Sequence, residues 1–161
     1  MSVSQNDGNY TNCTCDACKA IDDYEGALSG SIITFLNKLA ARFPYKEFST
    51  LAYLYTMNPP KHVKPLPNVN IMLCDIDCDR EVTLTENASG KEFVKAMEGW
   101  SKITNNIFVW DYGINFENRI NTLSYNLKNL RITQTPLTGL SLVAFSFEVR
   151  IIFRMFFPIN E

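Results

Sequence analysis

The chain has 161 residues, enough for one domain with a sizeable core, and carries a formal net charge of −2. This slight acidity gives no indication of a nucleic-acid partner or of attraction to an acidic membrane surface. Apolar residues make up 46% and charged residues 20%, the balance of an ordinary globular domain. No apolar run reaches the length of a bilayer span, and no signal peptide is evident. We therefore predict no nucleic-acid partner and no membrane span.

The apolar residues predict alternating strands and helices. In chain order we expect a strand at 2–5, a loop at 6–24, a helix at 25–43, a strand at 49–55, a proline-rich loop at 57–67, a strand at 69–73, a loop at 74–89, a helix at 91–101 and a strand at 107–110. Two more strands are expected at 142–147 and 149–153 because of their β-branched and aromatic content. Such alternation predicts an α/β fold with a parallel sheet.

Polar and aromatic clusters follow the predicted strands. Asn6-Asp7 comes after the first strand, Cys74-Asp75-Ile76-Asp77-Cys78 after the third, and Trp110-Asp111-Tyr112 closes the fourth. In a parallel α/β barrel, the residues at the carboxyl ends of the strands form the active site. The pattern therefore favours an enzyme and a partial TIM-type (β/α) barrel, which would be a fragment of a larger catalytic domain because a full barrel needs about 200 residues.

The role of Asn6 and Asp7 has two interpretations. A carboxylate beside an amide at a barrel mouth can act as a general acid or can orient a substrate amide. Asn-Asp-Gly is equally ordinary turn chemistry, and spacing alone favours the turn.

Aromatic residues supply the other candidates for a site. Trp110 and Tyr112 offer flat surfaces on which sugar rings stack, and Asp111 lies between them. The alternative is a core Trp with a capping Asp. Tyr53 and Tyr55 lie on one face of their predicted strand, where either hydroxyl could stabilise a developing charge, although core packing is the more common role.

The five cysteines fall in two loop clusters, Cys13-x-Cys15-x-x-Cys18 and Cys74-x-x-x-Cys78. Four thiolates would suit structural zinc, whereas an oxidising compartment would favour a disulfide, and free thiols are the third alternative. No cofactor other than this zinc is indicated, since the glycines form no phosphate-binding loop. His62 is the one histidine, and its proline-rich loop favours a surface role.

Together these motifs resemble a bacterial family of domains of unknown function, found mainly in Bacteroidetes, some members of which are TIM-barrel glycoside hydrolases, including endo-β-N-acetylglucosaminidases. The resemblance covers about residues 1–118 and rests on a set of motifs: Ser4-Gln5-Asn6-Asp7, the Cys13–Cys18 cluster, Leu51-Ala52-Tyr53-x-Tyr55 with Pro59-Pro60, Leu73-Cys74, and Trp110-Asp111-Tyr112 with Asn115-Phe116. Residues 119–161 depart from the family pattern, and we interpret them as a divergent tail from a frameshifted or truncated gene end.

The resemblance implies a glycosidase exported to the periplasm or cell surface, with a glycan containing N-acetylhexosamine as substrate. It favours Asp7 and Asp111 as catalytic carboxylates with Tyr53 in support, and Asn6, Tyr55, Trp110 and Tyr112 as substrate-binding residues. We expect the isolated chain to be inactive without the remainder of the barrel. The alternative is a non-catalytic carbohydrate-binding or structural domain, stabilised by zinc at the five cysteines.

Overall fold

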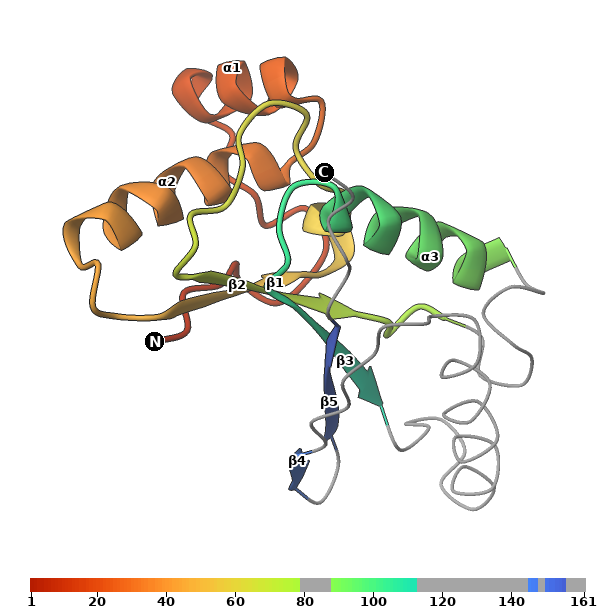
Figure 1. Ribbon diagram of the computed structural model, residues 1–161. Helices are drawn as coiled ribbons and strands as arrows, with labels where there is room; N and C mark the ends of the chain where they lie inside the picture. The colour runs from red at the N-terminus through yellow and green to blue at the C-terminus, as the bar shows by residue number, and fades with distance from the viewer. Residues whose placement is uncertain (79–87, 113–144, 148–149, 156–161) are drawn as a thin grey trace.

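The computed structural model of the chain describes residues 1–78, 88–112, 145–147 and 150–155 (Figure 1). The elements are α1 (Asp16–Glu25), α2 (Ser29–Arg42), β1 (Phe48–Ala52), the 3₁₀ helix η1 (Leu54–Thr56), β2 (Val69–Cys74), α3 (Ala88–Ser101), β3 (Ile107–Tyr112), β4 (Phe145–Phe147) and β5 (Arg150–Met155). The α/β class predicted from the sequence is confirmed.

The strands of the described residues form one five-stranded sheet in the order β1-β2-β3-β5-β4. β1, β2 and β3 are parallel, as the alternation of elements predicted, and the bridge from Ser2 to Ser49 adds the N-terminal segment in parallel beside β1. β5 pairs antiparallel with β3, and β4 pairs antiparallel with β5. The expected barrel is not closed in the described residues, because the strand beside β3 runs in the opposite direction and the sheet stays open.

One face of the parallel strands forms the core with α2 and α3. Alternate strand residues point to the same face, so Phe48 and Ala52 align with Val69 and Leu73 along the register of β1 and β2. The buried residues contributed by the helices to this core are Ile33, Leu36, Ala40, Phe93, Ala96, Met97 and Trp100. In the described part of the chain, α1, α2 and α3 all lie on this one side of the sheet (Figure 1).

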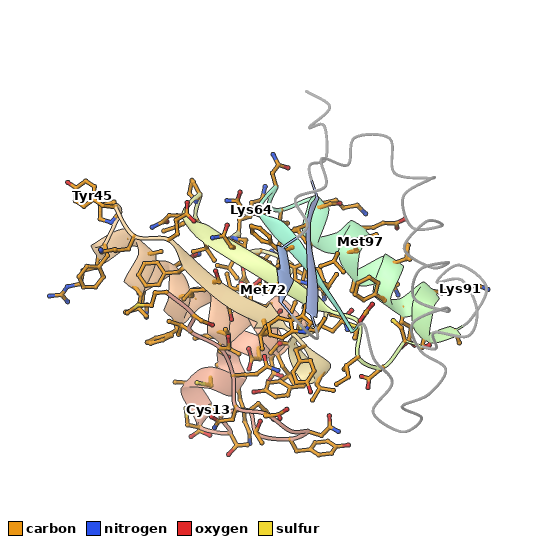
Figure 2. All side chains as sticks on the ribbon, turned by 90° about the horizontal axis from the view of Figure 1, so that it is seen from below. Cys13, Tyr45, Lys64, Met72, Lys91 and Met97 are labelled. Carbon is orange, nitrogen blue, oxygen red and sulfur yellow. The ribbon has the colours of Figure 1, made fainter. Side chains whose placement is uncertain are left out.

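The opposite face of the same strands carries a half-buried apolar row beside the polar pair Ser49 and Asn70. Leu51 of β1 aligns with Met72 of β2, and Met72 aligns with Phe108 of β3. Met72 is labelled in Figure 2, where the sheet is seen from below. A strand with apolar residues on both faces is typical of a parallel sheet that is covered on both sides.

The first helical region differs from the prediction. α1 occupies part of the expected loop 6–24, and the expected helix 25–43 begins only at Ser29. Gly26 ends α1 in the left-handed conformation (φ 66°), which glycine adopts without steric cost. The Asp22 carboxylate then accepts hydrogen bonds from the backbone N–H (2.7 Å) and hydroxyl (3.2 Å) of Ser31 in the first turn of α2. The chain therefore forms two helices because a side chain of α1 caps α2.

The predicted strand 49–55 is also shorter than expected. β1 ends at Ala52, and Leu54 takes a left-handed conformation (φ 49°) that no strand can accommodate. The hydroxyl of Thr56 accepts the backbone N–H of Tyr53 at 3.1 Å and so closes the 3₁₀ turn. Tyr53 and Tyr55 consequently lie in a turn at the strand end rather than on one face of the strand.

The proline-rich loop after η1 is held by a buried carboxylate. Glu25, at the end of α1, is 5% exposed and accepts the backbone N–H groups of His62 (2.7 Å) and Val63 (3.0 Å). Its own carbonyl accepts the N–H of Lys61 at 3.0 Å. His62 is exposed and its ring lies 4.4 Å from that of Tyr24, which agrees with a surface role.

We predict that Glu25→Ala destabilises the protein by about 3 kcal/mol, because two hydrogen bonds to a buried charged acceptor are lost. The free energy of unfolding is measured by urea denaturation. Asp23→Ala is the matched control, since Asp23 is an exposed acidic residue of the same helix, and it should stay within about 0.5 kcal/mol of the wild type. Equal stability of the two variants would contradict the anchoring role of Glu25.

Candidate functional site

The carboxyl ends of the parallel strands bring the predicted site segments to one edge of the sheet. Beyond the Ser2 bridge the chain continues into Gln5-Asn6-Asp7, and β1 leads directly into Tyr53. β2 leads into Asp75-Ile76-Asp77, and β3 ends in Trp110-Asp111-Tyr112. Because these strands are parallel neighbours, their ends meet at the same edge.

Asp7 and Tyr53 are in direct contact at this edge. The Tyr53 hydroxyl donates a hydrogen bond of 3.2 Å to Asp7 Oδ1, although 46 residues separate them in sequence. Asp7 itself is exposed, so the carboxylate remains open to a ligand. The backbone around it is a turn, with the Thr11 hydroxyl donating to the carbonyls of Asn6 (3.3 Å) and Gly8 (3.2 Å). Turn formation and contact with Tyr53 are therefore both present at this segment.

Gln5 and Thr56 tie the two segments together. The Gln5 side-chain amide donates to the Tyr53 carbonyl at 2.6 Å, and its oxygen accepts a hydrogen bond from the buried Thr56 hydroxyl. Gln5 thus binds the turn that follows β1 through both its amide nitrogen and its amide oxygen. Neither residue was among the site candidates predicted from the sequence. The short polar stretch before Asn6 was a sequence signal for Gln5, whereas no such pattern marked Thr56.

The environment of Tyr53 raises the pKa of its hydroxyl above the usual value of about 10. Burial of the ring is the main cause, followed by the negative charge of Asp7 and its hydrogen bond, and then by the charges of Cys74 and Asp77 when these groups are ionised. All of these disfavour a phenolate, so Tyr53 stays a neutral hydrogen-bond donor across the physiological range.

The segment after β2 contributes two more carboxylates. Asp77 is exposed and its charge acts on Tyr53, whereas Asp75 is only 6% exposed and its backbone N–H donates to the Trp110 carbonyl at 3.3 Å. The sequence marked this polar cluster at a strand end, but it did not separate Asp77 from its neighbours. The influence of Asp77 on Tyr53 depends on the parallel pairing of β1 and β2.

The other site residues predicted from the sequence lie in the turn after the N-terminal segment, in η1 and in β3. Asn6 is exposed in the turn, Tyr55 is half-buried in η1, and Trp110 is half-buried in β3 beside Cys74 of β2. Asp111 and Tyr112 are the last two residues of β3, opposite Ile151 and Arg150 of β5. Their side chains lie outside the described part of the chain, so the backbone alone places them at the site edge.

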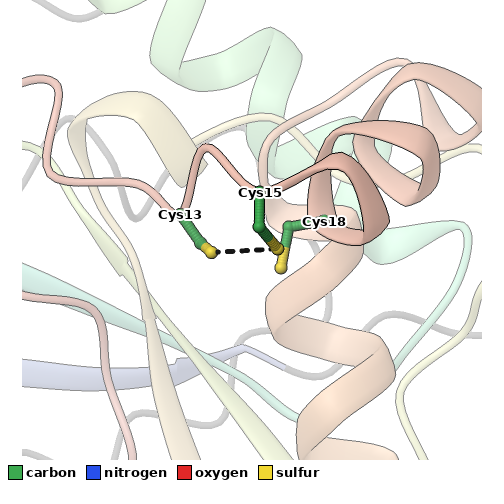
Figure 3. Close-up of side chains that lie close together, drawn as sticks. All are labelled: Cys13, Cys15 and Cys18. Atoms are coloured by element: carbon green, nitrogen blue, oxygen red, sulfur yellow. Dashed lines mark hydrogen bonds between the residues drawn. The ribbon is translucent and has the colours of Figure 1, made fainter.

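The cysteines separate into two groups. Cys13 and Cys15 are exposed and Cys18 is half-buried, and their three sulfur atoms all lie within 4.8 Å of one another (Figure 3). Cys74 and Cys78 lie instead among the buried residues at the end of β2. Within the described ranges the structure thus assembles three thiols of the predicted five-cysteine cluster, and Cys74 and Cys78 are not part of this group.

Within this group the thiols of Cys15 and Cys18 differ in acidity. The pKa of Cys15 is lowered to about 7, mainly because the backbone N–H of Cys18 and the thiol of Cys13 stabilise its thiolate. The pKa of Cys18 is raised to about 12, mainly because its thiol donates to Cys13 and Cys15. Cys15 occupies the position immediately before α1, where the first N–H groups of the helix are unpaired within it. Cys15 therefore ionises before Cys18.

Comparison with known proteins identifies a family. The sequence profile of a domain of unknown function, DUF4838, matches residues 1–131. The chain belongs to this family. The match includes every site segment described above and extends past residue 118, where the resemblance noted from the motifs ended. No curated protein and no solved structure shows significant similarity to this DUF4838 chain.

Among the described residues, none forms a helix of the length and apolar character needed to cross a membrane.

We predict that Asp7→Asn lowers the pKa of Tyr53, since it removes a negative charge that opposes ionisation. Burial and Asp77 remain, so the pKa should stay above that of free tyrosine. Titration of ring-labelled tyrosine by ¹³C NMR measures this, with Tyr53→Phe to assign the signal and Asp23→Asn as the control. An unchanged pKa in Asp7→Asn would contradict the contact.

The same pKa predicts a loss of stability in alkali. The folded pKa of Tyr53 lies above the unfolded value of about 10, so the stability from this group is complete below that pH. It declines as the pH rises through the folded pKa, because the unfolded chain releases the proton first. Tyr53→Phe should therefore unfold with a flatter pH dependence above pH 10 in urea denaturation, and an unaltered slope would contradict this.

Proposed function

We propose that this DUF4838 chain supplies part of the active site of a glycoside hydrolase that acts on glycans containing N-acetylhexosamine, in the manner of an endo-β-N-acetylglucosaminidase. The observation that carries the proposal is the Asp7–Tyr53 hydrogen bond at the carboxyl edge of three parallel strands. An exposed carboxylate beside a neutral tyrosine hydroxyl provides both an acceptor and a donor at that edge.

These groups suit the chemistry of an N-acetylated sugar. Some glycosidases use the acetamido group of the substrate as nucleophile, which requires one carboxylate to orient the acetamide and another to protonate the leaving oxygen. Asp7 would accept a hydrogen bond from the acetamide N–H and stabilise the positive charge that develops on the acetamide as its oxygen attacks the anomeric carbon, and the Tyr53 hydroxyl would hold the Asp7 carboxylate in position through its hydrogen bond. The second carboxylate would be Asp77, which follows β2, or Asp111, which is the penultimate residue of β3.

The arrangement of strands supports a partial barrel as the scaffold. The N-terminal segment, β1, β2 and β3 lie side by side in sequence order and in parallel, and the helices lie on one face (Figure 1). A doubly wound sheet would instead place helices on both faces. The half-buried apolar face with Leu51 and Met72 would then line the barrel interior, and further strands would complete it.

The substrate would be an N-glycan, and Trp110 and Tyr112 would stack on its sugar rings. Export to the periplasm or cell surface would bring the protein to such glycans.

We predict that Asp7→Asn and Asp111→Asn each lower glycan hydrolysis by about 100-fold or more, since general acid–base groups contribute effects of this size. The complete gene product that carries this sequence is assayed on an N-glycoprotein and on aryl N-acetylglucosaminides. Asp77→Asn tests the alternative second carboxylate, and Asp23→Asn on α1 is the control. Asp7→Asn should still bind glycan, because the change removes one charge and little volume.

The alternative function is a non-catalytic carbohydrate-binding or structural domain. It predicts glycan binding without turnover by the folded wild type, and loss of that binding in Trp110→Ala. Absence of hydrolysis by a folded complete protein would therefore contradict the glycosidase and leave the binding domain.

A further inference from the structure

The cluster of Cys13, Cys15 and Cys18 has no part in the hydrolysis proposed above. The three residues come from two adjoining elements: Cys13 and Cys15 lie in the loop after Asp7, and Cys18 lies in the first turn of α1. Figure 3 shows the three side chains converging on one point beside the start of the helix. Three thiols that converge from a loop and a helix form a candidate site for a thiophilic ion.

The sulfur positions match the requirements of a bound zinc ion. A tetrahedral zinc site with Zn–S bonds of about 2.3 Å places its sulfur atoms about 3.8 Å apart. Cys13 Sγ and Cys15 Sγ are 3.4 Å apart, and no pair in the cluster exceeds 4.8 Å. Small side-chain rotations would therefore bring all three sulfur atoms to bonding distance without moving the backbone of α1.

We propose that Cys13, Cys15 and Cys18 bind one zinc ion through their thiolates, with the fourth coordination position occupied by a solvent molecule. Within the described residues no further Cys, His, Asp or Glu joins the group. The exposure of Cys13 and Cys15 leaves the fourth position open to water. Binding releases the thiol protons to solvent, and neither the metal nor the sulfur changes oxidation state.

The site would order the loop that carries Asp7. Gly8–Asn12 connect Asp7 to Cys13, and the loop is held by the weak contacts of the Thr11 hydroxyl with two carbonyls. A zinc ion bound by both this loop and α1 would fix the loop to the helix. The helix α1 is itself packed tightly against α2, since a Cβ added at Gly30 of α2 would lie 2.6 Å from the Cβ of Glu25. Zinc binding does not depend on the glycosidase proposal.

The test is a titration of the reduced full chain with Co²⁺, which substitutes for zinc and reports thiolate ligands by charge-transfer absorption. We expect one Co²⁺ per chain, displacement by Zn²⁺, and loss of the charge-transfer absorption in Cys13→Ser, Cys15→Ser and Cys18→Ser. Cys74→Ala is the matched control, because Cys74 is a buried cysteine outside the cluster, and it should keep the absorption. Zinc should also raise the Tm of the wild type but not that of Cys18→Ser.

Three results would overturn the proposal. The first is no thiolate absorption from the reduced wild type, which decides the matter even if a variant fails to fold. The second is an unchanged spectrum in Cys15→Ser. The third is loss of the spectrum in a folded Cys74→Ala, which would assign the ligands to a different set of cysteines. An inactive glycosidase with normal Co²⁺ binding would refute the proposed function alone.

Discussion

Parallel pairing of the N-terminal segment, β1, β2 and β3 is the constraint on which the site depends. It brings residues that are far apart in sequence to one edge, so that Asp7 reaches Tyr53 and Asp77 influences the same hydroxyl. The pairing is maintained by the core between the strands and α2 and α3. The edge itself is completed by polar contacts, since Gln5 ties the N-terminal segment to the turn that follows β1.

Much of this organisation was predictable from the sequence. The alternation of strand and helix patterns predicted the parallel strands, and residues 69–73 could be identified as a strand because they are apolar on both faces except at Asn70. The helix α1 was missed because its apolar content is low and its role is polar: Asp22 and Glu25 face inward to cap α2 and to hold the proline-rich loop. A buried carboxylate has no periodic pattern by which sequence alone can find it.

The location of the candidate residues was predictable from the sequence, but their contacts were not. The clusters at the strand ends lie at one edge of the sheet, whereas the Asp7–Tyr53 contact depends on a left-handed Leu54 that ends β1 early. Spacing also could not separate the cysteines. Cys74 and Cys78 are buried at and after the end of β2, whereas Cys13, Cys15 and Cys18 lie together where the loop meets the start of α1.

The most direct test of the account is hydrogen–deuterium exchange of the protein with and without N,N′-diacetylchitobiose. If the carboxyl edge binds N-acetylated sugars, the sugar will slow amide exchange mainly in residues 4–7, 53–56 and 74–77. This protection will be lost in the double variant that combines Asp7→Asn with Tyr53→Phe. Protection confined to another surface, such as the exposed face of α3, would contradict the assignment of the site to this edge.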